Sequence, residues 1–278
     1  MLSSILLTAL IAVVAAQNTT CVSGDAVHMI IARASLEAPG PGVIGQVATQ
    51  VAAQLPGSDM VSVVYPATIN DYTTSEDMGV VAMTKLVTDY ASRCPSSKMV
   101  LMGYSQGAQV TADVLCGRSD GATFTTTQAA PTTITDKVAA VVLMGDPSKT
   151  TTETFLQGTS TKNGIFPRQD IAGCGAVANR MVSYCNAGDT FCDSGNSLQV
   201  HLSYVQNNGT SAVTFVLNQI KPGTAAAASA AGGTSSNGTA AVAAKAKEGQ
   251  ATTLRMSENR VWSIVAGFTA FGLGVSIF

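Results

Sequence analysis

The sequence predicts an α/β fold in which a mostly parallel sheet is covered by helices on both faces. The main apolar runs are short and nearly continuous rather than alternating, as expected for strands that are buried on both faces. Stretches with helical character separate these runs, which is typical of βαβ units. The folded region, residues 17–220, contains no internal repeat and has the size of a single domain.

Each predicted element is placed by its local pattern. Four strands are expected in the runs AVHMIIARA, MVSVVYPA, KMVLMGYS and VAAVVLMGD, at residues 26–34, 60–67, 98–105 and 138–146. A fifth strand is expected at residues 180–184, which completes a five-stranded sheet. Helices are expected at residues 45–55, 76–93, 106–116 and 202–220.

Residues 1–16 are predicted to be a signal peptide. The segment MLSSILLTALIAVVAA is apolar, ends in small residues and precedes the polar stretch 17–20. It lacks a basic residue at its start, but it is too short to span a bilayer comfortably as a membrane anchor. We therefore expect a secreted, extracellular protein, with a short anchor or a buried first strand as the alternatives.

The C-terminal part of the chain predicts a stalk and an anchor. Residues 221–250 are rich in Ala, Gly, Ser and Thr, which predicts a disordered stalk. Residues 251–278 end in the apolar run VWSIVAGFTAFGLGVSIF, and such a tail behind a polar spacer predicts a glycosylphosphatidylinositol (GPI) attachment signal. The candidate attachment residues are Gly249 and Ala251, with Asn237 or Gly238 as more distant options. The alternative is a single transmembrane helix at the cell surface.

Other features agree with secretion. Three Asn-x-Thr sequons, at Asn18, Asn208 and Asn237, predict N-glycosylation. Six cysteines remain after residue 16, and an even number in a secreted chain predicts three disulfides. Their spacing lacks the paired C-x2-C clusters of a zinc site, so we expect no metal and no other cofactor. The net charge of −2 without a long basic run argues against nucleic acid as a partner, and we expect a monomer.

Ser105 is the candidate nucleophile. It lies in the sequence GYSQG at residues 103–107, after a predicted strand and before a predicted helix, which is the context of a nucleophile elbow. Side chains at Gly103 or Gly107 would clash in so tight a turn. The helix that begins at Gln106 would direct its N–H groups toward a negative charge formed at the serine.

His201 is the candidate general base for Ser105. The chain has only two histidines, and His28 lies inside an apolar strand, where a histidine is usually part of the core. His201 follows the serine and precedes the last predicted helix, in the chain order of serine, acid and histidine found in α/β hydrolases.

Asp189 is the candidate acid that orients the imidazole. Asp193 is a second near candidate, and Asp146 and Asp170 lie further away along the chain. Asp189 is favoured because it lies between Cys185 and Cys192. A disulfide that closed this short loop would hold the carboxylate in place.

Three motifs resemble the cutinase and acetylxylan esterase family of compact secreted serine esterases. They are GYSQG at 103–107, SYCNAGDTFC at 183–192 and HLSY at 201–204, in the family's order and approximate spacing. The likeness extends from about Cys21 to Ile220. It implies a three-layer α/β/α sandwich with no large lid, and it implies a triad formed by Ser105, Asp189 and His201.

The resemblance also implies the oxyanion hole and the disulfide pairs. One oxyanion donor would be the backbone N–H of Gln106, and the other would be Ser35 in the loop ARASLE after the first strand. Two disulfides would be Cys21–Cys94 and Cys185–Cys192, which leaves Cys116–Cys174 as the third.

The expected substrate is an ester of a plant cell wall or cuticle polymer. The segment TFCDSGNSLQV between acid and base is mostly polar, and YPA at 65–67 and MGDP at 144–147 look more like acetylxylan esterases. We therefore favour short-acyl or polysaccharide esters. A cutinase is the alternative, in which Phe191, Leu198 and Val200 would line an acyl groove. A non-catalytic cell-wall protein on an esterase scaffold is the alternative of another class.

Overall fold

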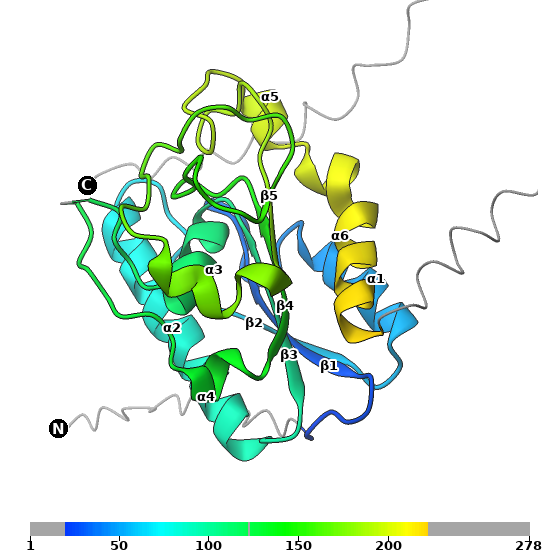
Figure 1. The fold of residues 1–278 in the computed structure, drawn as a ribbon. Helices are drawn as coiled ribbons and strands as arrows, with labels where there is room; N and C mark the ends of the chain where they lie inside the picture. Colours follow the sequence, from blue (N-terminus) through cyan, green and yellow to red (C-terminus); the bar gives the residue numbers. More distant parts are fainter. Residues whose placement is uncertain (1–19, 122, 222–278) are drawn as a thin grey trace, which may run out of the picture. The chain divides into compact units, whose positions relative to one another are not determined.

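The structure, a computed structural model, describes residues 20–121 and 123–221 and contains one sheet with helices on both faces (Figure 1). The strand order is β2-β1-β3-β4-β6-β5, and each neighbouring pair is parallel. The strands are β1 Val27–Ala32, β2 Asp59–Ser62, β3 Lys98–Tyr104, β4 Val138–Met144, β5 Leu156–Gln157 and β6 Met181–Tyr184. The predicted α/β fold is confirmed.

The sheet differs from the prediction at its two edges. The sixth strand, β5, has only two residues, which is too short for a hydrophobic pattern to indicate it. At the other edge β2 ends at Ser62, although the apolar run continues to residue 67. Pro66 lies in this continuation and has no backbone N–H for a sheet ladder.

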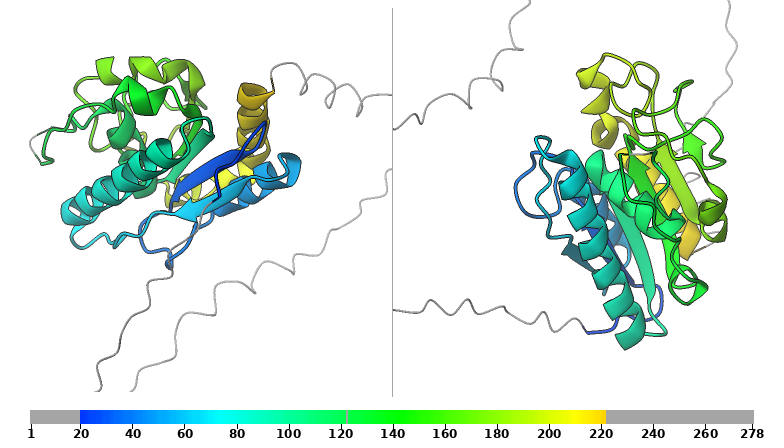
Figure 2. Two further views of the ribbon diagram at one scale, coloured as in Figure 1. Left: turned by 90° about the horizontal axis from the view of Figure 1, so that it is seen from below. Right: turned by 90° about the vertical axis from the view of Figure 1, so that its left-hand side faces the viewer.

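Two helices cover each face of the sheet (Figure 2). The helices α1 (Gly45–Gln54) and α6 (Tyr204–Ile220) pack on one face, and α2 (Tyr72–Arg93) and α3 (Gln106–Cys116) pack on the other. The shorter elements are α4 Thr132–Thr135, α5 Leu198–His201 and two 3₁₀ helices, η1 Ala172–Ala176 and η2 Ala178–Arg180. This is the three-layer arrangement that was expected.

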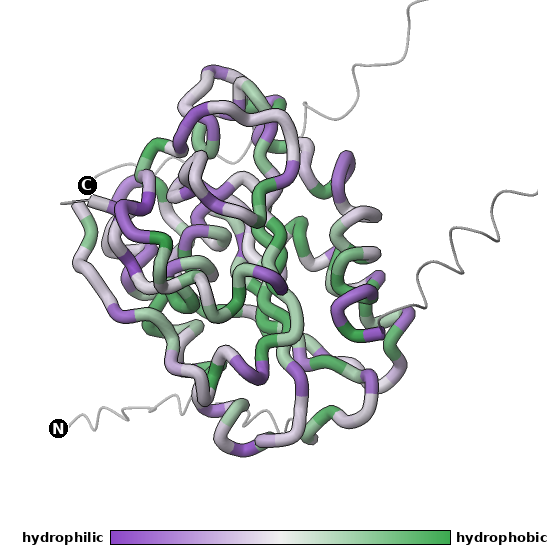
Figure 3. The backbone as a smooth tube through the Cα atoms, viewed as in Figure 1, coloured by the Kyte–Doolittle hydropathy of each residue, from purple (hydrophilic) through white to green (hydrophobic). Residues whose placement is uncertain are grey.

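The core explains why the strands have continuous apolar sequences. In β1, Val27, Met29 and Ile31 contribute to the cluster under α1 and α6, whereas Ile30 and Ala32 contribute to the cluster under α2 and α3. Every residue of β1 is buried, because helices cover both faces of the sheet. The green, hydrophobic segments of the backbone tube accordingly concentrate in the central strands (Figure 3).

Three disulfides join segments that are separated along the chain. They are Cys21–Cys94 and Cys185–Cys192, which the resemblance implies, and Cys116–Cys174, which was expected as the remaining pair. The first ties the start of the described chain to the end of α2, and the second ties the end of α3 to η1. The third closes the loop that contains Asp189.

Several sequence-based predictions fall on residues that the structure does not describe. The signal peptide, the stalk beyond residue 221, the anchor signal with Gly249 and Ala251, and the sequons at Asn18 and Asn237 lie outside the described residues. Asn208 lies within α6 and is half-buried, unlike the exposed loop asparagine that usually carries a glycan. Within residues 20–121 and 123–221, no helix has both the length and the apolar character to cross a membrane.

A network of charged side chains is buried beside α3. Arg118 lies 3.3 Å from Glu76 and 3.5 Å from Asp113, and Arg168 contacts Asp113 and lies 3.8 Å from Glu153. Burial raises the pKa of Glu76 to about 7 and that of Glu153 to about 8, despite the opposing attraction of the arginines. Carboxylates outnumber guanidinium groups here, so part of the network holds protons near neutral pH.

The raised pKa of Glu153 predicts lower stability in alkaline solution. Its contribution is complete below the ordinary pKa of 4.5 and is lost as the pH rises through about 8, because the folded state binds the proton more tightly. We expect the melting temperature to fall by roughly 5 °C or more between about pH 5 and pH 9. Glu153→Gln should flatten this dependence, since the amide oxygen can still accept the Thr150 N–H.

Differential scanning calorimetry across this pH range measures the effect. Asp89→Asn, which changes an exposed carboxylate on α2, is the matched control. A melting temperature of the unmodified protein that rose steadily toward alkaline pH would contradict the prediction.

Candidate active site

Ser105 lies in a strained turn between β3 and α3. Its φ of 53° and ψ of −121° are unusual for a residue with a side chain. Its backbone N–H donates to the Met144 carbonyl at 2.8 Å, which ties the turn to the end of β4. The turn thus holds the serine at the carboxyl end of the sheet, where α3 begins.

The two glycines of GYSQG make this turn possible. A Cβ added at Gly103 would lie 2.1 Å from the Gly107 carbonyl oxygen, and one added at Gly107 would lie 2.2 Å from the Ala32 carbonyl oxygen. Both obstacles are backbone atoms that cannot rotate away. The sequence predicted that side chains at positions 103 and 107 would clash. The structure attributes this clash to direct contacts of α3 with β3 and β1.

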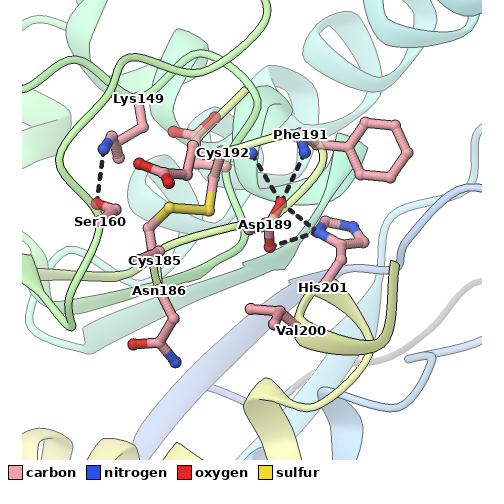
Figure 4. The surroundings of a disulfide bond; sticks show 12 residues. Lys149, Ser160, Cys185, Asn186, Asp189, Phe191, Cys192, Val200 and His201 are labelled. Atoms are coloured by element: carbon pink, nitrogen blue, oxygen red, sulfur yellow. Dashed lines mark hydrogen bonds and ion pairs between the residues drawn. A yellow bond between two sulfur atoms is a disulfide. The ribbon is translucent and has the colours of Figure 1, made fainter. Parts of the chain in front are cut away.

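Ser105, His201 and Asp189 form a continuous chain of hydrogen bonds. His201 Nε2 lies 2.9 Å from Ser105 Oγ, and His201 Nδ1 lies 2.9 Å from Asp189 Oδ2. The residues are 8%, 3% and 0% exposed, so all three are buried, Ser105 the least and Asp189 completely. Figure 4 shows Asp189 and Phe191 from the disulfide loop beside His201, which ends α5. This arrangement can transfer a proton from the serine to the histidine.

The alternative candidates have other partners. His28 is buried, lies 2.7 Å from Asp59 and stacks on the Tyr90 ring at 3.8 Å. Asp193 accepts the backbone N–H groups of residues 161, 162 and 188, and so joins two loops. Asp146 accepts from Ser148, and Asp170 accepts the N–H of residue 172. None of the four contacts His201 through a hydrogen bond in the described structure.

Asp189 is surrounded by hydrogen-bond donors. Its Oδ1 accepts the N–H groups of Phe191 and Cys192 at 2.7 and 2.9 Å, and its Oδ2 accepts the Tyr204 hydroxyl at 2.8 Å. Burial works to raise the pKa of this carboxyl, but the His201 contact and the two amides lower the pKa below its ordinary value. An ionised Asp189 fixes the proton of His201 on Nδ1, which leaves Nε2 free to accept the serine proton.

Two residues that support His201 and Asp189 were not singled out from the sequence. Gly145 has a φ of 64°, and a Cβ added there would lie 2.8 Å from His201 Cε1. Tyr204 lies three residues after His201, as the first residue of α6, and its hydroxyl reaches Asp189. Burial raises the pKa of this hydroxyl, which stays a neutral donor. The position of Tyr204 in the motif HLSY was a signal that could have identified it.

The oxyanion donors expected from the resemblance lie on adjacent elements. Gln106 is buried as the first residue of α3, so its N–H has no acceptor within the helix. Ser35 is half-buried in the loop after β1, where Ala32 is opposite Gly103 in the sheet. The Glu37 carboxylate holds this loop by accepting the N–H groups of Ala34 and Val43, both at 2.7 Å. The role of Ser35 and Gln106 as donors stays a prediction.

No cluster of three potential metal ligands among His, Cys, Asp and Glu is present in the part of the chain that the structure describes. The described site consists of a hydroxyl, an imidazole and a carboxylate.

Comparison with known proteins relates this site to one family. Residues 23–220 match the family model named Cutinase. Acetylxylan esterase 2 of Talaromyces purpureogenus is 32% identical over 208 residues, which cover 71% of this chain and 88% of that protein. Cutinase 11 of Verticillium dahliae is 32% identical over 210 residues, which cover 72% and 71% of the two chains. The catalytic core domain of acetyl xylan esterase from Trichoderma reesei has a similar structure, with a TM-score of 0.66, 31% identity and coverage of 70% and 98%.

The Tyr204 hydroxyl is predicted to position Asp189 and His201. We expect Tyr204→Phe to lower kcat for a small ester roughly tenfold and to leave KM nearly unchanged, because substrate binding does not involve this hydroxyl. Steady-state kinetics measure the two constants. Tyr90→Phe is the matched control, since Tyr90 is also buried and its hydroxyl accepts the Val22 N–H on the other face of the sheet. Equal losses of kcat in both variants would show that Tyr204 has only a structural role.

Proposed function

The chain belongs to the cutinase family, and on that premise we propose that it is a secreted serine esterase that uses Ser105, His201 and Asp189. Its relatives are named acetylxylan esterase and cutinase, and the chain is a carboxylic ester hydrolase of this type. The observation that carries the assignment of the three residues is the chain of 2.9 Å contacts from Ser105 Oγ through His201 to Asp189.

The proposed reaction is acyl transfer in two steps. Ser105 Oγ attacks the ester carbonyl carbon while His201 Nε2 takes the serine proton. The negative oxygen of the tetrahedral intermediate is stabilised by the Gln106 N–H and by Ser35. The alcohol leaves with the proton from His201, and the acyl group remains on the serine. Water then attacks the acyl group with His201 as the base, which releases the carboxylic acid and restores the hydroxyl.

Short-acyl or polysaccharide esters are the substrate class that we favour. The segment that joins the acid and the base is mostly polar, and the motifs YPA and MGDP resemble the acetylxylan esterase branch.

A specific observation favours the alternative of an aliphatic polyester such as cutin. Leu198 and Leu202, on either side of His201, are 54% and 63% exposed, and Leu36 beside Ser35 is 74% exposed. These side chains could contact a long acyl chain.

The proposed location is the cell surface. An apolar segment at residues 1–16 supports secretion, and a stalk followed by an apolar tail at 261–278 supports a lipid anchor. A phosphatidylinositol-specific phospholipase C should release a lipid-anchored protein from intact cells. A protein held by a transmembrane tail would stay on the cells.

Labelling with a fluorophosphonate tests the assignment of the nucleophile. We expect the protein to become labelled at Ser105 and the label to be absent from Ser105→Ala, because only an activated serine attacks the reagent. Ser105→Ala should also lower kcat for p-nitrophenyl acetate by at least about 10³-fold. Ser62→Ala, at the end of β2, is the control that should retain both properties. Absence of labelling in well-folded protein would support a non-catalytic scaffold instead.

Hydrolysis of esters with different acyl lengths tests the substrate class. We expect kcat/KM for p-nitrophenyl acetate to exceed that for p-nitrophenyl laurate by roughly tenfold or more, since the segment before His201 is mostly polar. Release of acetate from acetylated xylan should likewise exceed release of hydroxy fatty acids from cutin. The reverse order for both pairs would assign the protein to the cutin-type alternative.

A further inference from the structure

A groove of about 470 Å³ lies at one edge of the sheet, between β5, β6 and α6. This volume is in the range of small-molecule sites. Phe155, Met181 and Phe215 contribute its apolar surface, and none of the three residues of the candidate active site lines it. The groove is therefore separate from the site at Ser105.

The polar lining of the groove consists of uncharged amides and hydroxyls. These side chains are Thr154, Gln157, Asn179, Tyr184, Asn208 and Ser211. None of the six side chains forms a hydrogen bond with another described residue. No charged side chain is among the described residues that line the groove. Such a surface can donate and accept many hydrogen bonds but does not favour a charged ligand.

Asn208 and Tyr184 are the two most enclosed of these six polar side chains. The Asn208 Oδ1 atom is buried and has no hydrogen-bond partner, although buried polar atoms are nearly always paired. Tyr184 is only 5% exposed, and burial raises the pKa of its hydroxyl to about 12. The hydroxyl is thus a neutral group near neutral pH. The Asn208 Nδ2 group and the Tyr184 hydroxyl are not among the buried unpaired atoms, so a ligand in the groove could accept a hydrogen bond from the first and pair with the second.

We propose that this groove binds a neutral sugar chain. A sugar ring presents hydroxyls around its edge and C–H groups on its faces, which match the uncharged polar side chains and the phenylalanines. Two sources of such a chain are compatible with this chemistry. One is a polysaccharide, and the other is a glycan on Asn208 itself, which is the first residue of the sequon Asn208-Gly209-Thr210. The inference goes beyond the proposed function, because binding requires no reaction at Ser105.

Binding of unacetylated xylohexaose tests the inference in the full chain. The groove variants are compared in the Ser105→Ala, Thr210→Ala background, in which hydrolysis and the sequon are removed while Asn208 is kept. We expect calorimetric titration to detect binding, and we expect Asn208→Ala or Tyr184→Phe to weaken it roughly five- to tenfold. Asn207→Ala, an exposed neighbour on α6, is the matched control and should bind like the background. Melting temperatures of all variants confirm that they fold.

The measurements distinguish three cases: the groove holds the protein's own glycan, it binds a free polysaccharide, or it binds no sugar. If the chain with an intact sequon carries a glycan by intact mass and binds xylohexaose only after Thr210→Ala, its own glycan occupies the groove. If it carries no glycan and binds xylohexaose directly, the ligand is a free polysaccharide. Absence of binding in the Thr210→Ala background, or equal binding by the Asn208, Tyr184 and Asn207 variants, would overturn the inference. Hydrolysis of p-nitrophenyl acetate by the Asn208→Ala variant with Ser105 intact reports on the proposed function separately.

Discussion

Close contacts between backbone segments around Ser105 fix the position of this serine. The rest of the site depends on that position. Gly103 and Gly107 leave no room for a Cβ, so α3 begins immediately after β3 and lies against the end of β1. The serine between them adopts a positive φ, a conformation that the surrounding packing must stabilise. Ser105, the proposed nucleophile, is therefore held between a strand and a helix rather than by a free loop, which favours a defined geometry for catalysis.

The wholly buried α3 imposes a further constraint, because its polar side chains must find partners inside the protein. Gln106 contacts Ser75 on α2, and Asp113 contacts Arg168 from a distant loop. These contacts join α3 to the segments on both of its sides. The same burial is the main cause of the raised pKa values of Glu76 and Glu153, and neighbouring carboxylates raise these pKa values further. The support of α3 and the predicted sensitivity of stability to pH thus have a common origin.

Asp189 and His201, the proposed acid and base, depend on a different part of the molecule. The Cys185–Cys192 disulfide closes the loop of Asp189, while the short helix α5 presents His201. Tyr204, the first residue of α6, donates to Asp189 and so connects the loop with the helix that covers the sheet. The two halves of the site, one on α3 and one on the disulfide loop, meet at the contact between Ser105 and His201.

The sequence by itself determined the features that depend on local chemistry. The buried strands follow from continuous apolar runs, the turn at Ser105 follows from the two glycines, and the choice of His201 follows from the presence of only two histidines. Only the tertiary structure decided that the Tyr204 hydroxyl donates to Asp189, that Gly145 leaves space for the imidazole and that β5 extends the sheet. The reason is physical: periodicity and backbone freedom are properties of neighbouring residues, whereas these contacts join segments that become neighbours only when the sheet and its helices pack together.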